Sequence, residues 1–61
     1  MKDENNNLMT ALDVAEMLQM KMSWVRQRVH KDELPYYKIG NLVRFNRTDI
    51  QRWLDTKREN I

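Results

Sequence analysis

The sequence predicts a mainly α-helical fold with one small β-hairpin. Two segments, 11–18 and 22–31, repeat apolar residues at the spacing of amphipathic helices. Two aromatic and β-branched runs, 36–39 and 42–45, follow with only two residues between them, which is the spacing of a tight hairpin. A third helical pattern lies near the C-terminus. The expected order is therefore helix, turn, helix, hairpin, helix.

The first helix is expected to begin at Ala11. Thr10 and Asp13 have the spacing of a capping box, with aspartate in place of the usual glutamate. Val14 and Leu18 fall on the same side of the helix as Ala11, so this side is predicted to be buried.

The turn after this helix contains no glycine, although a left-handed residue commonly ends a helix. Either Gln19 takes that conformation at some energetic cost, or the turn has a different form. The second helix is expected from about Met22 to Lys31. Lys21 in front of it offers no capping side chain, which allows a late start with Ser23 as the cap.

The hairpin and the third helix follow from equally local signals. Pro35 should end the second helix, because a proline drives the preceding residue into extended geometry. Gly40, first of the two turn residues, indicates a type II′ turn. Asn46 followed by Asp49 marks another helix start. The apolar stripe of that helix is predicted to be Ile50, Trp53 and Leu54.

Length and composition exclude several classes of protein. The 61 residues suffice for one domain, expected at 8–58 between a disordered arm (1–7) and a short tail (59–61). The chain has no cysteine, so disulfides and thiolate–metal sites are excluded. No apolar run approaches the roughly 20 residues of a membrane span, so we expect a cytoplasmic protein without a membrane partner.

Positive charge gathers in two stretches, 21–31 and 36–47, which contain no carboxylate. Their cations are Lys21, Arg26, Arg28, Lys31, Lys38, Arg44 and Arg47. Such segregation is typical of phosphate binding, although a solvated surface would look the same. Two helices of which the second is basic, followed by a basic hairpin, form the layout of a winged helix-turn-helix. The predicted partner is double-stranded DNA.

An ordered series of motifs runs through residues 8–54. The motifs are Met9-Thr10, Val14-Ala15-Glu16-Met17-Leu18, Val25, Val29, Glu33-Leu34-Pro35, Lys38-Ile39-Gly40, Arg44-Phe45 and Ile50-x-x-Trp53-Leu54. The series resembles the excisionase-type helix-turn-helix family, a small relative of the MerR-like winged-helix domains. The chain departs from the usual family pattern at the turn 19–21, where Gly-Val-Ser is common. It also departs at Trp24, where a small residue is usual, and at Arg28, where an apolar residue is usual.

The resemblance implies DNA binding through the second helix and the hairpin wing. The candidate DNA-binding residues are Ser23, Trp24, Arg26, Gln27, Arg28, His30, Lys31, Lys38, Asn41 and Arg44. Gln27 can read an adenine edge and Arg26 a guanine edge, while the wing residues suit the backbone or the minor groove. For each, ordinary solvation is the alternative. Trp24 either packs on Arg28 as a cation–π pair or contacts DNA or a partner.

The leading functional expectation is an excisionase, or recombination directionality factor, that bends attachment-site DNA to assist a phage- or transposon-type integrase. We expect further copies of the chain to bind beside it on DNA. A small MerR-like transcriptional regulator is the runner-up. A protein-interaction module using Trp24 and the methionine-rich turn is an alternative of another class. With His30 as the single histidine and no glycine-rich phosphate loop, we expect no enzyme activity, metal or cofactor.

Overall fold

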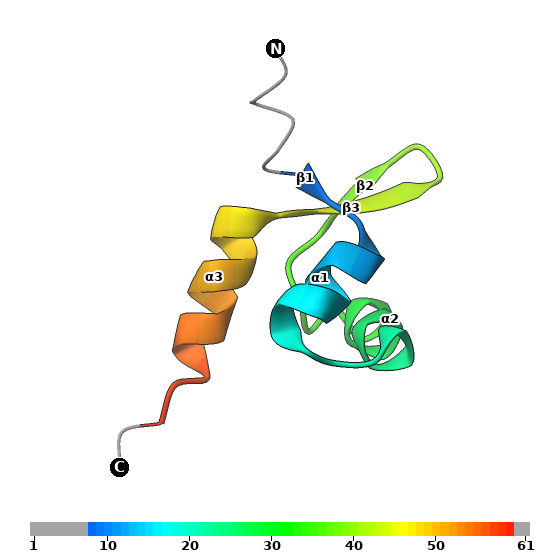
Figure 1. Cartoon of the computed structure of the whole chain (residues 1–61). Coiled ribbons are helices and arrows are strands. Elements are labelled where there is room, and N and C mark those ends of the chain that lie inside the picture. The colour runs from blue at the N-terminus through cyan, green and yellow to red at the C-terminus, as the bar shows by residue number, and fades with distance from the viewer. Residues whose placement is uncertain (1–7, 60–61) are drawn as a thin grey trace.

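The fold is a helix-turn-helix pair beneath a small sheet, with a third helix standing to one side (Figure 1). The computed structural model describes residues 8–59. The elements are β1 (Leu8–Met9), α1 (Ala11–Leu18), α2 (Met22–His30), β2 (Tyr37–Ile39), β3 (Leu42–Asn46) and α3 (Arg47–Thr56). This arrangement confirms the predicted winged helix-turn-helix. The expected arm at 1–7 and residues 60–61 of the expected tail lie outside the described residues.

The first helix begins as predicted. The backbone N–H of Asp13 donates to Thr10 Oγ1 at 3.1 Å, and the N–H of Thr10 donates to Asp13 Oδ2 at 3.0 Å. Both halves of the capping box are therefore made, with the shorter aspartate side chain still able to reach. The helix ends at Leu18, and its C-cap Gln19 has φ 57° and ψ 43°, so the left-handed alternative is the correct one of the two.

The second helix starts at Met22, as predicted, and not at the later alternative. Lys21 is its N-cap in extended geometry, with no capping hydrogen bond from its side chain to the described residues, and the helix begins at Met22. The expectation of a late start capped by Ser23 is therefore wrong. The Lys21 carbonyl accepts from Trp24 N at 3.0 Å and Val25 N at 3.2 Å, so the backbone alone closes the first turn. Burial of Val25 fixes the helix in this register.

The sheet has one strand more than the predicted hairpin. Leu8 and Met9 pair antiparallel with Asn46 and Phe45, so the strand order is β1-β3-β2. A strand of two residues is too short to show alternation in the sequence. It forms because Met9, only 3% exposed, joins the core beside Phe45.

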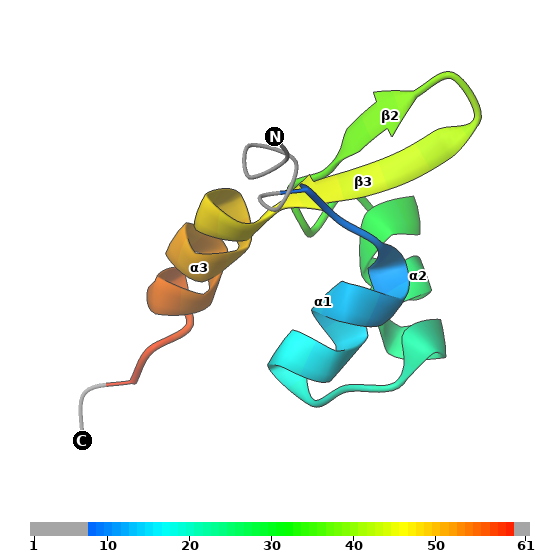
Figure 2. The ribbon, with the colours of Figure 1, turned by 45° about the horizontal axis from the view of Figure 1, so that its top comes forward.

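The hairpin itself matches its prediction. Ile39 lies opposite Leu42, and only Gly40 and Asn41 connect β2 to β3. Gly40 has φ 62°, whereas Asn41 is not left-handed, which is the pattern of a type II′ turn. The hairpin projects from the helices, with its turn at the far end (Figure 2).

Every element except β2 places at least one buried side chain in the core, and Leu34 adds one from the connection between α2 and β2. The buried residues are Met9, Val14, Ala15, Val25, Leu34, Phe45 and Ile50. The stripe predicted on α3 is buried only at its start: Ile50 is fully buried, Trp53 is half-buried and Leu54 is 38% exposed. Leu54 lies outside the core because the second half of α3 extends beyond the sheet (Figure 1).

Candidate nucleic-acid interface

One face of α2 is fully open to solvent. Val25 lies on the opposite face and is completely buried, so it sets the orientation of the helix. The exposed side chains recur at helical spacing and include no carboxylate. We call this set the α2 outer face: Ser23, Arg26, Gln27, His30 and Lys31, the last being the residue that caps the helix.

Trp24 and Arg28 lie on a different side of the helix. The Arg28 guanidinium is stacked over the Trp24 ring at 5.3 Å, which confirms the cation–π alternative for Trp24. Arg28 Nη1 also forms an ion pair with Glu33 Oε1 at 3.3 Å. Trp24 meets Trp53 edge-on at the joint between α2 and α3. These contacts turn both candidate residues toward α3 and away from the α2 outer face.

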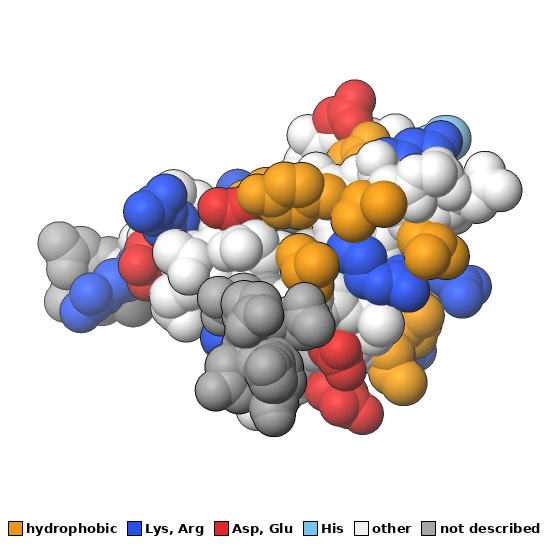
Figure 3. Space-filling model, turned by 90° about the horizontal axis from the view of Figure 1, so that it is seen from above, with side chains coloured by type: hydrophobic (Ala, Val, Ile, Leu, Met, Phe, Trp, Pro, Cys, Tyr) orange, Lys and Arg blue, Asp and Glu red, His pale blue; other side chains and the backbone are white. Residues whose placement is uncertain are grey.

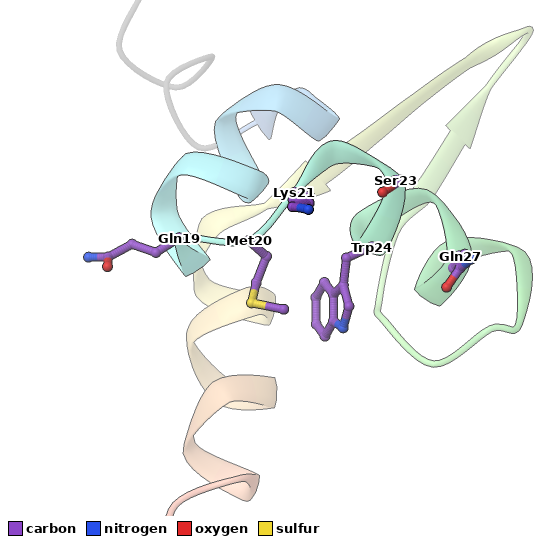
Figure 4. Close-up of a pocket in the computed structure, with 6 residues that line it drawn as sticks. All are labelled: Gln19, Met20, Lys21, Ser23, Trp24 and Gln27. Carbon is purple, nitrogen blue, oxygen red and sulfur yellow. The ribbon is translucent and has the colours of Figure 1, made fainter.

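A hollow of about 440 Å³ lies at the start of α2 (Figure 4). Met20 and Trp24 point the same way into the space beside α3, whereas Gln27 leaves the helix in another direction. The hollow is thus lined on one side by the polar residues Ser23 and Gln27 of the α2 outer face and on the other by the apolar side chains of Met20 and Trp24.

The connection after α2 fixes the wing relative to the helix. Asp32 adopts φ 57°, and its Oδ1 accepts a hydrogen bond from the Tyr36 hydroxyl at 3.1 Å. This hydrogen bond and the negative charge of Asp32 raise the pKa of the Tyr36 hydroxyl above its usual value of 10.0. Leu34, 2% exposed, anchors the same connection in the core. The sequence offered only a weak signal for this turn, since aspartate tolerates the left-handed region better than most residues.

The wing adjoins the α2 outer face. A hollow of about 330 Å³ separates α2 from β3, and both Arg26 and His30 line its helix side, with Val43 on its strand side. Val43 and Phe45 occupy the inner face of the sheet, toward the helices, while Arg44 alternates to the outer face. The register places Lys38 on the inner face with Val43, next to the α2 candidates, whereas Arg44 lies on the opposite face of the hairpin.

The wing candidates differ in the solvent exposure and hydrogen bonding of their side chains. Lys38 and Asn41 are exposed. Arg44 is half-buried, and its Nη1 donates to the Val43 carbonyl at 2.8 Å, which holds the side chain close to the strand. Viewed from above the sheet, basic and hydrophobic side chains lie next to one another (Figure 3). The hydrophobic residues of this surface carry no signal in the sequence that distinguishes them from core residues.

The carboxylates nearest in sequence to this surface already have partners. Glu33 pairs with Arg28, and Asp32 accepts the Tyr36 hydroxyl. The α2 outer face and the hairpin therefore present cations without carboxylates, beside polar groups on α2 and exposed apolar side chains on the hairpin. This charge distribution is suited to a phosphate backbone. No helix in the described part of the chain is long and apolar enough to cross a membrane.

A helix-turn-helix with a basic, exposed second helix and an adjoining hairpin defines the class of winged helix-turn-helix DNA-binding domains. A family model described as a helix-turn-helix domain matches residues 8–58. The chain therefore belongs to this family, the excisionase-type helix-turn-helix family that its motifs resemble. Searches of curated proteins and of solved structures found no match.

Proposed function

We propose that this protein binds specific double-stranded DNA sequences and acts as an excisionase, a recombination directionality factor that bends attachment-site DNA for an integrase. The observation that carries the proposal is the α2 outer face, which is exposed, contains no carboxylate and adjoins a basic wing. A helix of this kind fits the major groove, and the wing then lies against the neighbouring backbone or minor groove.

The candidate residues divide into readers and anchors. Gln27 lies in the middle of the α2 outer face and Arg26 at its edge beside the wing, where their amide and guanidinium groups can make bidentate contacts to base edges. Ser23, His30 and Lys31 flank them and suit phosphate contacts. The wing residues Lys38, Asn41 and Arg44 are assigned to backbone or minor groove.

Two residues leave the proposed contact set. Trp24 and Arg28 are engaged with each other, with Trp53 and with Glu33. We assign Trp24 and Arg28 instead to positioning α2 through contacts on its α3-facing side. The unusual residues at positions 24 and 28 then serve the packing of α3 against α2.

The size of the domain favours action in several copies. One recognition helix and a small wing bury on the order of 600–1,000 Å² on DNA, which is modest for a specific complex. The helices carry no heptad pattern that would join two chains in solution. We therefore propose a monomer in solution that binds cooperatively to adjacent DNA sites.

Deletion and complementation in cells that carry the gene test this function. Excision of the flanking mobile element is measured by amplification of the rejoined chromosomal site, alongside transcript levels of neighbouring genes. Wild type should restore excision, Gln27→Ala should not, and Gln51→Ala, which changes an exposed glutamine on α3, should restore it.

Other outcomes identify the alternatives. Unchanged excision with altered transcription would make the protein a regulator of the MerR-like type. Loss of function through Trp24 and Met20 variants, with no DNA binding at low salt, would make it a protein-interaction module.

A further inference from the structure

Two large apolar side chains flank the turn of the wing and are open to solvent. Ile39 is 52% exposed and Leu42 is 53% exposed. They lie directly opposite each other as the last pair of the β2–β3 ladder, so their side chains share one face of the hairpin. We call Ile39 and Leu42 the wing-tip pair.

The pair lies where the hairpin extends furthest from the helices (Figure 2). Its face of the sheet is the outer one, because Phe45 and Val43 on the alternate positions turn toward the core. Exposing two β-branched or γ-branched side chains at such a tip is unfavourable in water. A contact that removes them from water would offset this cost.

The charges around the pair favour DNA as that contact over a basic or neutral protein surface. Residues 36–47 contain Lys38, Arg44 and Arg47 and no carboxylate. Lys38 directly precedes Ile39 and is exposed, and Arg44 shares the outer face with the pair. Apolar side chains bordered by cations are suited to a groove with phosphates along its two edges.

The tip is also narrow. The turn has only two residues, and Gly40, at φ 62°, has no heavy atom of residues 8–59 within 4 Å of where a Cβ would stand, its chain neighbours aside. A slim, unobstructed turn of this kind suits the minor groove, which is about 6 Å wide in B-DNA.

We propose that the wing-tip pair acts as an apolar wedge, entering the minor groove next to the α2 site and partly unstacking one base step. This inference rests on the proposed function, because α2 in the major groove is what brings the wing to the adjoining minor groove. Unstacking by an inserted aliphatic side chain kinks the duplex toward the major groove. The wedge therefore supplies a mechanism for DNA bending and favours flexible TA or CA/TG steps under the tip.

The test uses the full chain on a duplex selected from a random pool for tight binding. Donor and acceptor dyes at the duplex ends report the bend by energy transfer. A 2-aminopurine placed at successive positions reports unstacking as an increase in fluorescence. With the unchanged protein, we expect a bend together with a fluorescence increase confined to one step beside the α2 site.

The double variant Ile39→Thr, Leu42→Thr places β-branched residues, which favour strands, at both positions but removes most of the apolar surface. We expect it to bind within about tenfold of wild type, because lost apolar contact and avoided unstacking oppose each other. The bend and the 2-aminopurine signal should both fall to the level of free duplex. Leu12→Gln on α1, which changes a leucine also 53% exposed, is the matched control and should leave both signals unchanged.

The outcomes separate the wedge from the proposed function. Tight binding by the unchanged protein without any 2-aminopurine signal would overturn the wedge and leave DNA recognition intact. This outcome does not depend on whether the double variant folds. A bend that survives in the double variant also overturns the wedge. If the double variant instead loses only its affinity for an integrase, the outer face of the hairpin is a protein-docking surface and the wedge is wrong. Absence of binding to every duplex overturns both proposals.

Discussion

Trp24 of α2 meets Trp53 of α3 edge-on, with the ring centroids 6.3 Å apart and the ring planes at 66°. A cation covers each ring: Arg28 lies 5.3 Å from the centroid of Trp24, and Lys57 lies 5.4 Å from that of Trp53. Edge-on aromatic pairs contribute about 0.5–1.5 kcal/mol beyond their buried area. Because α3 packs mainly against β3, this pair is a direct link between α3 and the helix that carries the α2 outer face.

Replacing Trp53 with alanine is therefore expected to lower the free energy of unfolding by about 2–3 kcal/mol, somewhat less than for a fully buried tryptophan. Urea unfolding followed by circular dichroism measures the change. Leu54→Ala on the same helix is the control and should cost less, about 1 kcal/mol, because Leu54 is 38% exposed and does not pack against the core. Equal losses in the two variants would contradict the role of the tryptophan pair.

Arg26 and Arg28 are expected to differ in kind although both are arginines of α2. Arg28→Ala removes the stacking on Trp24 and the ion pair with Glu33, so it should cost about 1 kcal/mol of stability. Its effect on DNA affinity should be small. Arg26→Ala should leave the unfolding free energy within about 0.5 kcal/mol and weaken DNA binding. Thermal unfolding and fluorescence anisotropy on the same two variants check this, and the opposite assignment of effects would refute our division of α2 into two sides.

Gln27 and Arg44 are expected to separate base reading from backbone binding. Gln27→Ala should cost about 1–3 kcal/mol at the specific site and relax sequence preference there, with little change in salt dependence. Arg44→Ala should weaken binding to all duplexes alike and reduce the salt slope by about one unit. Competition titrations against random duplex at several salt concentrations distinguish the two. An equal loss for specific and random DNA in Gln27→Ala would show that α2 is not the reader.

Gln19 offers a prediction about the turn of the helix-turn-helix. Its φ of 57° strains a residue with a Cβ by about 1–2 kcal/mol, and glycine relieves that strain. Gln19→Gly should therefore stabilise the fold by about 1 kcal/mol, after the larger entropy loss of glycine is included. Gln51→Gly in the interior of α3 is the control and should destabilise by a similar amount. A destabilised Gln19→Gly variant would show that the side chain, rather than the backbone, determines this turn.

The features predictable from sequence are those determined within a few residues. The Thr10–Asp13 capping box, the left-handed Gln19 and the Gly40 turn each depend on neighbouring side chains or on backbone sterics alone. The start of α2 near Met22 was predicted too, but the proposed Ser23 cap was wrong, because the Lys21 carbonyl closes the first turn without a capping side chain. Strand β1 forms only because Phe45, far along the chain, offers it an edge and a core.

The candidate site was predictable to the same degree. Helical spacing alone placed Gln27 opposite Val25, so its exposure followed from the sequence. Spacing could also pair Trp24 with Arg28, but it gave no sign that Trp53 would come against them from another helix. The exposure of Ile39 and Leu42 was not predictable either. Apolar residues in a short strand are normally taken to face the core, and the sequence does not show which face of the hairpin is covered.

Salt dependence of binding to duplex DNA tests the central claim, that the α2 outer face and the wing form a DNA-binding surface. Fluorescence anisotropy gives the association constant at a series of salt concentrations. If about four to six phosphates are neutralised, the slope of log K against log salt should be near −4 to −5. No binding at low salt, or a flat slope, would contradict the claim.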